Sequence, residues 1–419
     1  MRILFIHQNF PGQFVHLARG LARLGHDVRA VTDAASKQAK IVPTRTYRVD
    51  GHANAIRQAP ALTRNVTDCA LRGAAVAQEL TALRDEGFVP DLVIGHPGWG
   101  ETLFVKDVFP RTRLIVHAEY YHNAEGADAD FDPEFAKLDA QRRYRLRMRN
   151  ATTLLALASA DAAVTPTRWQ AGRFPADIRR KIGIIHEGID TDAVAPGSRA
   201  ALKFARDTMM LRAGQEVITF ASRNLEPYRG YHVFMRALPE ILRARPKAHA
   251  VIVGGDGVSY GPAPGRSRSW KTIFLNEVRD RLPMDRIHFV GHLKREHFIK
   301  MLQISSTHVY LTYPFVLSWS MLEAMSAGAL VVGSRTPPVE EIITDRIDGA
   351  LVDFFDHQAL AAKVIEANAS PEDFLAMRQA ARAKIVNQYD LRRRGLPLWF
   401  NLIEKVTGEK PAPPSQTRH

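Results

Sequence analysis

The sequence predicts an α/β protein with two Rossmann-like β/α/β domains that face an interdomain cleft, and three observations support this fold class. Short apolar segments typical of buried strands alternate with segments of helical periodicity along the chain. This alternation restarts after a stretch at residues 193–199 that contains Pro196, Gly197 and Ser198. The chain has 419 residues, which is enough for two domains that each bury a core.

The N-terminal half opens with a strand, a helix and a second strand. Residues 2–7 form the first predicted strand, apolar residues from Phe14 to Leu24 recur at helical spacing, and Gly25 ends that helix. Residues 27–32 form the second strand, and a unit of this kind implies parallel pairing. Four more strands are predicted in this half, at residues 91–95, 113–117, 162–165 and 182–185.

The C-terminal half repeats the pattern, with a predicted helix at residues 230–243 and strands at residues 216–221, 248–253, 287–290, 308–311 and 330–333. We therefore place an N-terminal domain at residues 1–192, a linker region at 193–212 and a C-terminal domain at 213–390. A last helix, at about residues 391–406, is expected to pack back onto the N-terminal domain. Residues 407–419 are expected to form a flexible tail.

Cysteine usage and hydropathy predict a cytoplasmic protein. Cys69 is the only cysteine, so no internal disulfide is expected, and this suits a reducing compartment. The chain enters a strand-like run at Arg2 without the pattern of a signal peptide. No run reaches the roughly 18 apolar residues that a membrane-spanning helix needs.

The chain is basic, with 57 Lys and Arg against 44 Asp and Glu and a formal net charge of +13. Such a charge suits anionic sugar nucleotides, nucleic acid or anionic lipid. Zinc-type Cys/His spacing and aromatic RNA-binding motifs are both missing from the sequence, so we expect no metal site and no nucleic-acid partner.

The densest basic cluster lies on a predicted helix and comprises Arg142, Arg143, Arg145, Arg147 and Arg149. A solvated helix face is the usual explanation of such a cluster. The alternative is a surface that binds anionic membrane lipid, which would make the protein peripheral to the inner face of a membrane.

The most informative segment is residues 314–353. A helix start at Ser318, Trp319 and Ser320 offers backbone N–H groups that have no partner within the helix and can face an anion. Glu323 follows one turn later, and a buried strand comes next. This combination is typical of a sugar-nucleotide site in an α/β sheet. The structural alternative is a helix capping box formed by Ser320 and Glu323.

Two arginines upstream of this segment are candidates for holding a diphosphate. Arg223 follows a predicted strand, and Arg229 stands before Gly230 at the start of a predicted helix. Strand ends in such sheets point at the ligand crevice, and guanidinium groups donate paired hydrogen bonds to phosphate oxygens. Either arginine taken alone is more simply explained as a surface charge.

In the N-terminal half, His7, His96 and His117 all follow or end predicted strands. A neutral imidazole can position a sugar hydroxyl or accept a proton, although one histidine at a strand end is usually incidental. The first loop lacks the G-x-G-x-x-G pattern of a dinucleotide site. Its Gly12 allows close approach of the backbone to a phosphate or sugar, or simply makes the turn.

Taken together, these residues resemble the GT-B-fold retaining glycosyltransferases of family 4, also called group 1. The resemblance covers nearly the whole chain and is strongest at residues 221–354. Residues 223–230 resemble the family segment R-L…K-G, with Arg229 where Lys is usual, and residues 322–328 closely resemble L-E-A-M-A-x-G. Other matches are residues 187–190 to N-G-V-D, 253–257 to V-G-x-G, 289–292 to F-x-G and 341–352 to E-x-V…N-G-x-L-V.

The sequence departs from the family pattern at one position of the donor motif. The family carries E-x7-E, in which the first Glu lies near the donor sugar and the second binds the ribose. Glu323 matches the second Glu, but Phe315 stands at the first, and Ser318 and Trp319 replace the usual Gly-Leu pair. The nucleotide-binding residues are therefore retained, while the contacts to the donor sugar differ.

The resemblance implies a cytoplasmic enzyme of polysaccharide biosynthesis that transfers a sugar from a UDP-, GDP- or ADP-sugar, without cofactor or metal, to a glycan, lipid-linked or small-molecule hydroxyl. Arg223 and Arg229 would neutralise the diphosphate, Glu323 would bind the ribose, and His117 would lie at the reacting centre. The other implied nucleotide-binding residues are Gly12, Gly255, Gly291, Ser318, Trp319 and Ser320. The alternatives are a GT-B epimerase or phosphorylase, and a non-catalytic nucleotide-sugar-binding protein. The base, sugar, acceptor and oligomeric state stay open.

Overall fold

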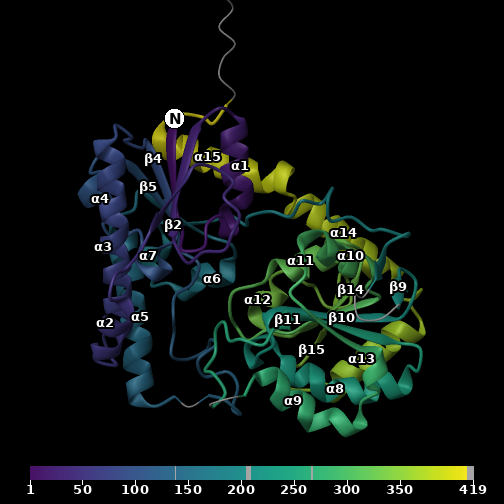
Figure 1. The fold of residues 1–419 in the computed structure, drawn as a ribbon. Coiled ribbons are helices and arrows are strands. Elements are labelled where there is room, and N and C mark those ends of the chain that lie inside the picture. Colours follow the sequence, from purple (N-terminus) through teal and green to yellow (C-terminus); the bar gives the residue numbers. More distant parts are fainter. Residues whose placement is uncertain (137, 204–208, 266–267, 413–419) are drawn as a thin grey trace, which may run out of the picture. The chain divides into compact units, whose positions relative to one another are not determined.

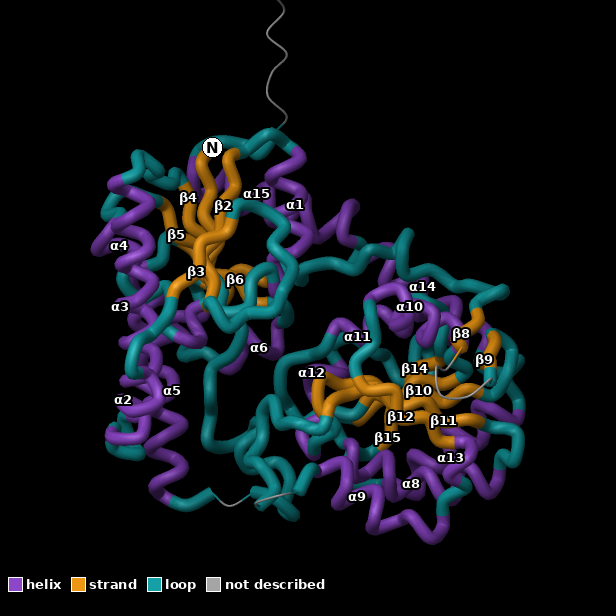
Figure 2. The backbone as a smooth tube through the Cα atoms, viewed as in Figure 1, coloured by secondary structure: helices purple, strands orange, loops and turns teal. Residues whose placement is uncertain are grey.

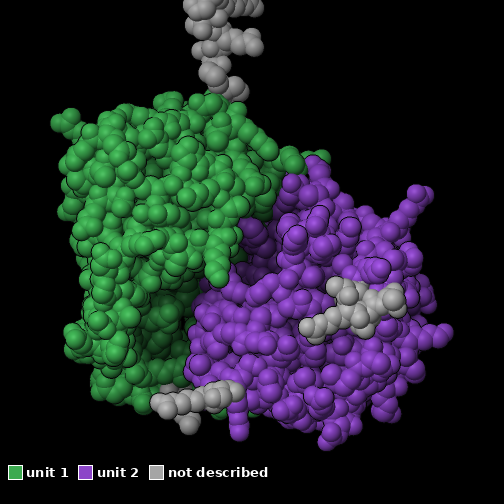
Figure 3. All heavy atoms as spheres, viewed as in Figure 1, with its two compact units in different colours: residues 1–188, 391–419 green, residues 189–390 purple. Residues whose placement is uncertain are grey.

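The computed structural model describes residues 1–136, 138–203, 209–265 and 268–412. The chain divides into two compact units, one formed by residues 1–188 with 391–419 and the other by residues 189–390 (Figure 3). Each unit is built on its own parallel sheet covered by helices (Figures 1 and 2).

The first unit contains a seven-stranded parallel sheet in the order β3-β2-β1-β4-β5-β6-β7. The central strands β1, β4 and β5 are short and mostly apolar, so both faces of the sheet can be covered there. The strands are β1 (Arg2–Ile6), β2 (Asp27–Asp33), β3 (Thr44–Tyr47), β4 (Leu92–Gly95), β5 (Arg113–His117), β6 (Ala162–Thr165) and β7 (Ile182–Ile184).

The two faces of this sheet support separate cores because successive side chains of a strand point in opposite directions. In β1, Leu4 and Ile6 join one core, which includes Val76 and Leu80 of α3 (Arg64–Asp85). Residues Ile3 and Phe5 of the same strand join the other core, on the side of α1 (Val15–Arg23) and α15 (Leu396–Thr407). The remaining helices of this unit are α2 (His52–Gln58), α4 (Val105–Val108), α5 (Ala140–Ser159), α6 (Arg168–Arg173) and α7 (Ala176–Arg179).

The C-terminal helix α15 belongs to the first unit, although it follows the whole second unit, residues 189–390, in the sequence. Its Trp399 and Ile403 are buried in the same core as Leu17 and Leu21 of α1. Residues 413–419, which make up most of the predicted tail, lie outside the described residues.

The second unit contains a six-stranded parallel sheet in the order β12-β11-β10-β13-β14-β15. Its strands are β10 (Val217–Asn224), β11 (His249–Gly255), β12 (Ile287–Gly291), β13 (Thr307–Tyr310), β14 (Leu330–Ser334) and β15 (Ala350–Val352). Helices α8 (Tyr231–Ala244), α9 (Trp270–Val278) and α13 (His357–Ala369) lie on one side of it (Figure 1). Helices α10 (Arg295–Ile304), α11 (Trp319–Ser326) and α14 (Leu375–Gln388) lie on the other side, and α12 (Pro337–Glu340) follows β14 (Figure 1).

The segment predicted as a linker, residues 193–212, lies in the second unit. It includes a small antiparallel hairpin of β8 (Ala201–Lys203) and β9 (Met210–Arg212). Residues 204–208 of this segment lie outside the described residues. Within the described part of the chain, no helix is both long enough and apolar enough to cross a membrane.

Both sheets reverse their strand order at an internal point, which places particular loops at the same edge. In the first unit the reversal lies between β1 and β4, and in the second it lies between β10 and β13. Ligands of open α/β sheets bind beyond the carboxyl ends of the strands at such points. The loops after β1, β4, β10 and β13 are therefore the expected ligand-binding loops.

Candidate functional site

Arg229 lies in the loop that follows β10. Its side chain forms hydrogen bonds to the loop that follows β13. Its Nη1 atom donates to the Thr312 hydroxyl at 2.8 Å and to the Val316 carbonyl at 2.9 Å. The residue is 6% exposed. It ends a short 3-10 turn, Pro227–Arg229, and the next residue, Gly230, has a φ of +67°. A Cβ atom there would lie 2.3 Å from Cβ of Leu311, so only glycine fits.

Aromatic rings surround the guanidinium of Arg229. Its central carbon lies 5.1 Å from the centre of the Tyr260 ring and 5.9 Å from that of Phe315. Burial alone would lower the pKa of Arg229, but Tyr310, Tyr260 and Glu226 raise it above its ordinary value. The side chain is therefore a permanent buried cation. Among the described residues, no carboxylate forms an ion pair with it.

Arg223, the second predicted arginine, lies within β10, which extends to Asn224 and is longer than the sequence predicted. Its side chain is exposed. The described contacts that tie the loops together come from Arg229 and not from Arg223.

Glu226 is a buried carboxylate that the sequence analysis did not single out. It is 0% exposed and accepts the backbone N–H groups of Ser259 at 3.0 Å, Tyr260 at 3.2 Å and Gly261 at 3.3 Å. It thereby holds the loop that carries Tyr260 against Arg229. A carboxylate between the apolar Leu225 and Pro227 was the available signal, because such a residue must find donors once it is buried.

The helix start predicted near Ser318 is present, with a different cap from the one the capping-box alternative required. The N-cap of α11 is Ser318, whose side chain accepts from the Ser320 N–H, and the Ser318 N–H donates to the Tyr310 hydroxyl at 2.8 Å. Trp319 and Ser320 are the first two helical residues. The capping-box alternative is therefore wrong, since Ser320 is inside the helix and Glu323 is its fifth residue.

Glu323 has a structural partner of another kind. Its Oε1 atom lies 2.5 Å from Nη1 of Arg295, which is half exposed, while the Glu323 side chain is 5% exposed. Burial raises the pKa of Glu323 even though Arg295 acts to lower it. The carboxylate is thus held by one cation at the edge of the site, with lone pairs left to accept from a ligand hydroxyl.

The two predicted glycines of this unit lie at the ends of neighbouring strands. A Cβ atom on Gly255, the last residue of β11, would lie 2.7 Å from both Asn224 Oδ1 and His292 Nε2. Gly291, the last residue of β12, has a φ of +63°, and a Cβ atom there would meet no other atom within 4 Å. Close packing therefore favours glycine at Gly255, and the positive φ favours glycine at Gly291.

In the first unit, His7, His96 and His117 come together at the strand ends. The rings of His7 and His96 are 5.6 Å apart between centres, and His96 stacks on His117 at 5.8 Å. His7 follows β1 and His96 follows β4, on the two sides of the point where the strand order reverses. All three side chains are buried. The cluster is therefore a product of the strand order.

His117 forms a buried pair with Glu187, whose Oε1 atom lies 3.0 Å from Nε2 of the imidazole. Burial would lower the pKa of His117, but the Glu187 and Glu119 carboxylates raise it above its usual range. Burial would likewise raise the pKa of Glu187, but His117 and His186 lower it. Both shifts favour an imidazolium paired with a carboxylate. In the sequence, Glu187 stands out only as part of a turn motif.

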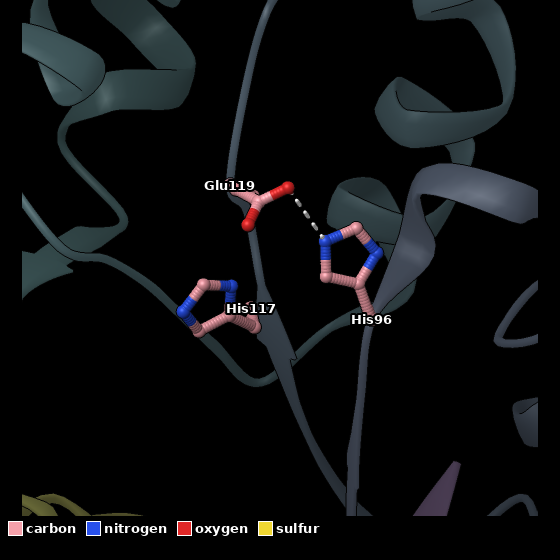
Figure 4. A group of neighbouring side chains, drawn as sticks. All are labelled: His96, His117 and Glu119. Atoms are coloured by element: carbon pink, nitrogen blue, oxygen red, sulfur yellow. Dashed lines mark ion pairs between the residues drawn. The ribbon is translucent and has the colours of Figure 1, made fainter. Parts of the chain in front are cut away.

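Glu119 is the second acidic residue beside these histidines (Figure 4). Its Oε2 atom lies 3.4 Å from Nε2 of His96. Burial would raise the pKa of Glu119, but His96, His117 and His7 lower it to about 2. Burial lowers the pKa of His7 to about 3, so this imidazole is neutral. The strand ends of the first unit therefore carry both hydrogen-bond donors, from the imidazoles, and acceptors, from the Glu119 carboxylate.

Gly12 lies in the loop after β1, where its φ is +47°. A Cβ atom at this position would lie 2.6 Å from Cε1 of His7. The structure thus places Gly12 against the histidine cluster, and it explains the glycine by backbone conformation and close packing.

The predicted basic helix is α5, which begins after the N-cap Asp139. The side chains of Arg143, Arg145, Arg147 and Arg149 are exposed, and Arg142 is partly exposed. Two apolar residues of the same helix are also exposed, Tyr144 to 53% and Leu155 to 61%. Arg143 forms an ion pair with Glu125 at 2.5 Å, and both side chains are exposed to solvent.

Two consecutive α/β units, each with a parallel sheet that reverses its strand order at an internal point, are the architecture of the GT-B fold class. Two family models match the chain, "Glycosyl transferase family 4 group" over residues 24–194 and "Glycosyl transferases group 1" over residues 209–384. The chain belongs to this family of glycosyltransferases, the family 4 or group 1 enzymes.

Curated relatives match at low identity. The chain is 24% identical over 230 residues to the D-inositol 3-phosphate glycosyltransferase of Segniliparus rotundus, which covers 54% of this chain and 49% of that protein. It is 26% identical over 256 residues to the GDP-mannose-dependent alpha-(1-6)-phosphatidylinositol monomannoside mannosyltransferase of Mycolicibacterium smegmatis, covering 60% of this chain and 64% of that protein. The matched region thus spans less than two thirds of either relative.

Solved structures match over almost the whole chain. The Anabaena protein HepE, crystallised in complex with UDP, has a TM-score of 0.66 at 16% identity and covers 96% of this chain and 100% of its own. The sucrose-phosphate synthase of Thermosynechococcus elongatus has a TM-score of 0.70 at 16% identity and covers 98% of this chain and 100% of its own. These likenesses confirm the predicted GT-B fold class.

Proposed function

We propose that the protein transfers a sugar from a nucleotide diphospho-sugar to a hydroxyl acceptor with retention of anomeric configuration. The observation that carries this proposal is Arg229, a buried cation without a carboxylate partner among the described residues. A buried charge without an ion pair is costly, and an anionic ligand would lower that cost. Its place beyond β10, at the strand-reversal point, is where such sheets bind nucleotides.

In this proposal the second unit binds the donor. Arg229, assisted by Arg223, neutralises charge on the diphosphate as the bond to the sugar breaks. The positive end of α11, which begins at Trp319 after the N-cap Ser318, faces the same phosphates and adds favourable charge there. Glu323 accepts a hydrogen bond from a ribose hydroxyl, and Gly255 and Gly291 let the nucleotide approach the strand ends.

The first unit binds the acceptor, with His117 at the reacting centre. Attack comes from the face that the leaving diphosphate occupies, and the departing phosphate helps to accept the proton of the acceptor hydroxyl. No covalent intermediate on the protein is required, and neither a metal nor a cofactor is invoked. A titrating histidine paired with a carboxylate is suited to positioning a sugar hydroxyl at this step.

For the donor we propose a UDP-, GDP- or ADP-sugar. The structural neighbour HepE was crystallised with UDP and with UDP-glucose, and the mannosyltransferase relative is named as GDP-mannose-dependent. For the acceptor we propose a glycan, a lipid-linked sugar or a small polyol. The two curated relatives are named for inositol phosphate and for a phosphatidylinositol mannoside.

Phe315 supports one alternative, a protein that binds nucleotide sugars without turning them over. Its ring packs edge-on against Tyr228 at 5.6 Å and lies 5.0 Å from the ring of Tyr260. An aromatic side chain therefore occupies the position where the family motif carries a carboxylate for the donor sugar.

A donor screen followed by a turnover assay tests the proposal. Binding to the native state raises apparent stability, so the correct nucleotide sugar should raise the melting temperature of the full chain. With that donor, release of free nucleotide diphosphate should require a hydroxyl acceptor from a glycan and polyol panel. Donor binding without turnover on any acceptor would establish the non-catalytic alternative.

Arg229→Ala should lower the rate of transfer by about 100-fold or more, because it removes a charged donor from the leaving diphosphate. Arg229→Lys should retain more of the rate, since it keeps the charge. Arg281→Ala removes an exposed arginine of the same unit and serves as the control. A normal rate in Arg229→Ala would refute the diphosphate role.

We also propose that α5 brings the protein to anionic membrane surfaces, on the basis of its exposed arginines beside Tyr144 and Leu155. Each basic residue near such a surface contributes about 1 kcal/mol, so a combined Arg145→Glu and Arg149→Glu variant should lose most binding. Vesicle flotation with and without phosphatidylserine at low salt measures this. Equal binding of the wild type and the combined variant to both vesicle types would reject the proposal.

A further inference from the structure

A shared hydrogen bond determines which ring nitrogen carries the proton in three histidines of the first unit. In each, the backbone N–H two residues later donates to Nδ1, in the pairs Asn9–His7 (2.9 Å), Gly98–His96 (3.1 Å) and Gly188–His186 (3.0 Å). A neutral imidazole has one donor and one acceptor nitrogen. Because Nδ1 is the acceptor, Nε2 carries the hydrogen and is a donor in each ring.

For His96, this donor lies beside Glu119 without forming a hydrogen bond to it. The distance from His96 Nε2 to Glu119 Oε2 is 3.4 Å, and Figure 4 shows the imidazole beside the carboxylate. The His96 side chain is 5% exposed, whereas that of Glu119 is 33% exposed. A buried histidine therefore lies at ion-pair distance from a carboxylate that a ligand can reach. In the described part of the chain, His96 is the partner that lies at ion-pair distance from the Glu119 oxygens.

His117 lies on the other side of the same carboxylate (Figure 4). A ring nitrogen of His96, a ring nitrogen of His117 and an oxygen of Glu119 all lie within 4.8 Å of one another. Nε2 of His117 is bound to Glu187, and its Nδ1 atom is buried with no hydrogen-bond partner among the described residues. A buried polar atom without a partner calls for an explanation, and a ligand is one.

Geometry alone would also suit a metal ion, but the tautomer of His96 opposes it. A metal needs the lone pair of Nε2, and this nitrogen carries a hydrogen as long as Nδ1 accepts from Gly98. An anionic ligand is opposed by the charge of Glu119 and of nearby Glu187. A hydroxyl meets both conditions, because it is neutral, donates to a carboxylate and accepts from an N–H.

We propose that Glu119 binds a neutral hydroxyl, or two adjacent hydroxyls, of the sugar or polyol acceptor, and that His96 is a positioning residue that holds the carboxylate. The proposal rests on the proposed function for the identity of the ligand as acceptor. Binding of a polyol can nevertheless be measured without donor and without turnover, so the two can fail separately.

The test is calorimetric or NMR titration of the full chain with three probes. These are the neutral polyols myo-inositol and methyl α-D-mannoside, inorganic phosphate, and zinc chloride. The variants are Glu119→Gln and Glu119→Ala. Glu125→Gln is the matched control, since Glu125 lies six residues further on with a 68% exposed side chain. Losing a hydrogen bond to a charged group should weaken polyol binding by about 10-fold or more in both Glu119 variants. The control should bind as wild type does.

Three results would overturn the proposal. The first is equal polyol affinity in wild type and both Glu119 variants, and the second is no polyol binding at concentrations up to about 100 mM, where even weak sites fill. The third is tight zinc binding that Glu119→Gln abolishes, which would establish a metal site. A polyol site that depends on Glu119 in a protein without transferase activity would overturn the proposed function alone.

His96 provides an independent test if the Glu119 variants do not fold. His96→Gln keeps an N–H donor near the position of Nε2, whereas His96→Ala removes it. Polyol affinity should fall in His96→Ala and largely recover in His96→Gln. If the two variants bind equally, His96 does not position the carboxylate, and the proposal is wrong in that part. Nucleotide-sugar affinity should stay unchanged in both, which a general loss of structure would not allow.

Discussion

At the scale of single residues, Arg229 and Glu323 are two buried charges whose surroundings differ. Arg229 donates to neutral oxygens of Thr312 and Val316 and lies between aromatic faces. Glu323 is paired with Arg295, which reaches solvent. A buried cation that has no ion pair favours an anion, whereas an ion-paired carboxylate keeps acceptor capacity for a neutral hydroxyl. This difference supports phosphate at Arg229 and ribose at Glu323.

The Glu323→Gln substitution should mainly weaken nucleotide binding. A glutamine keeps the size of the side chain but loses the charge-assisted acceptor, so the Kd for the nucleotide sugar should rise by about 10-fold. The melting temperature should change little, because Arg295 can return to solvent. Calorimetric titration and a thermal melt measure the two effects.

Arg295→Gln is the matched control for this substitution, since it breaks the same ion pair from the other side. It should leave nucleotide affinity closer to that of wild type. If both variants lose stability equally and neither loses affinity, Glu323 serves only the ion pair.

At the scale of elements, the loops beyond the strand ends are held by side chains from other loops. Glu226 accepts three N–H groups of residues 259–261, and Asn224 accepts the N–H of Gly257 at 3.2 Å and donates to Ser259 at 2.8 Å. The loop rich in Gly, Pro and Ser after β11 is thereby attached at its first part. Residues 266–267 of that loop lie outside the described residues.

The Glu226→Gln substitution should release this attachment. A glutamine offers one acceptor oxygen and brings an NH2 group toward three backbone donors, so about 1–3 kcal/mol of the free energy of unfolding should be lost. Hydrogen exchange should become faster at residues 257–261, and nucleotide affinity should fall because Tyr260 is no longer held beside Arg229. Denaturant unfolding and exchange mass spectrometry provide the measurements.

Glu240→Gln on α8, where the side chain is exposed, is the control and should change neither stability nor exchange. Unchanged protection of residues 257–261 in Glu226→Gln would show that the loop is held by other contacts.

The start of α11 shows where reasoning from local sequence fails. The spacing of Ser320 and Glu323 satisfies the capping-box pattern, yet the helix begins at Trp319 with Ser318 as its cap. Tyr310 at the end of β13 accepts the Ser318 N–H, and Arg295 from α10 pairs with Glu323. Partners from elsewhere in the fold therefore decided which serine became the cap.

At the scale of the whole molecule, buried neutral histidines link stability to pH. Burial lowers the pKa of His7, His122 and His308 to about 3 each. In the unfolded chain a histidine has a pKa of about 6.5, so between these values the unfolded state binds more protons. Their contribution is complete above about pH 6.5 and is lost progressively as the pH falls toward 3. His117 acts in the opposite sense, because its pKa is raised.

We therefore expect the free energy of unfolding to fall steadily on acidification from pH 7 to pH 4, by a few kcal/mol. Removing one such histidine should reduce the slope. His308→Asn suits this test, because the side chain is fully buried and its Nδ1 atom bonds to the Thr219 hydroxyl at 2.8 Å, a contact that an amide can replace. Denaturant unfolding at several pH values gives the slope.

His297→Asn is the control, since the His297 side chain is 47% exposed. It should keep the slope of the wild type. The same slope in His308→Asn would mean that other groups govern the acid sensitivity.

The sequence by itself determined the fold class and the family, because both depend on local properties. Alternating strand and helix signals predicted six strands before residue 190 and five in the second half, and the structure contains a strand at each of these places. The strands β3, β8, β9 and β15 were missed, since each has only three or four residues. Motif spacing also named Arg229, Glu323 and the three strand-end histidines as chemically important.

Only the tertiary structure decided which of these groups meet and in what state. His117 and Glu187 are 70 residues apart in the sequence, and Arg229 and Thr312 are 83 apart. No local pattern encodes such pairs, because strand order and loop path bring them together. The structure also assigned the His96 proton, the carboxylate of Glu119 and the role of Glu226, since burial and partners set the state of a titratable group and residue type does not.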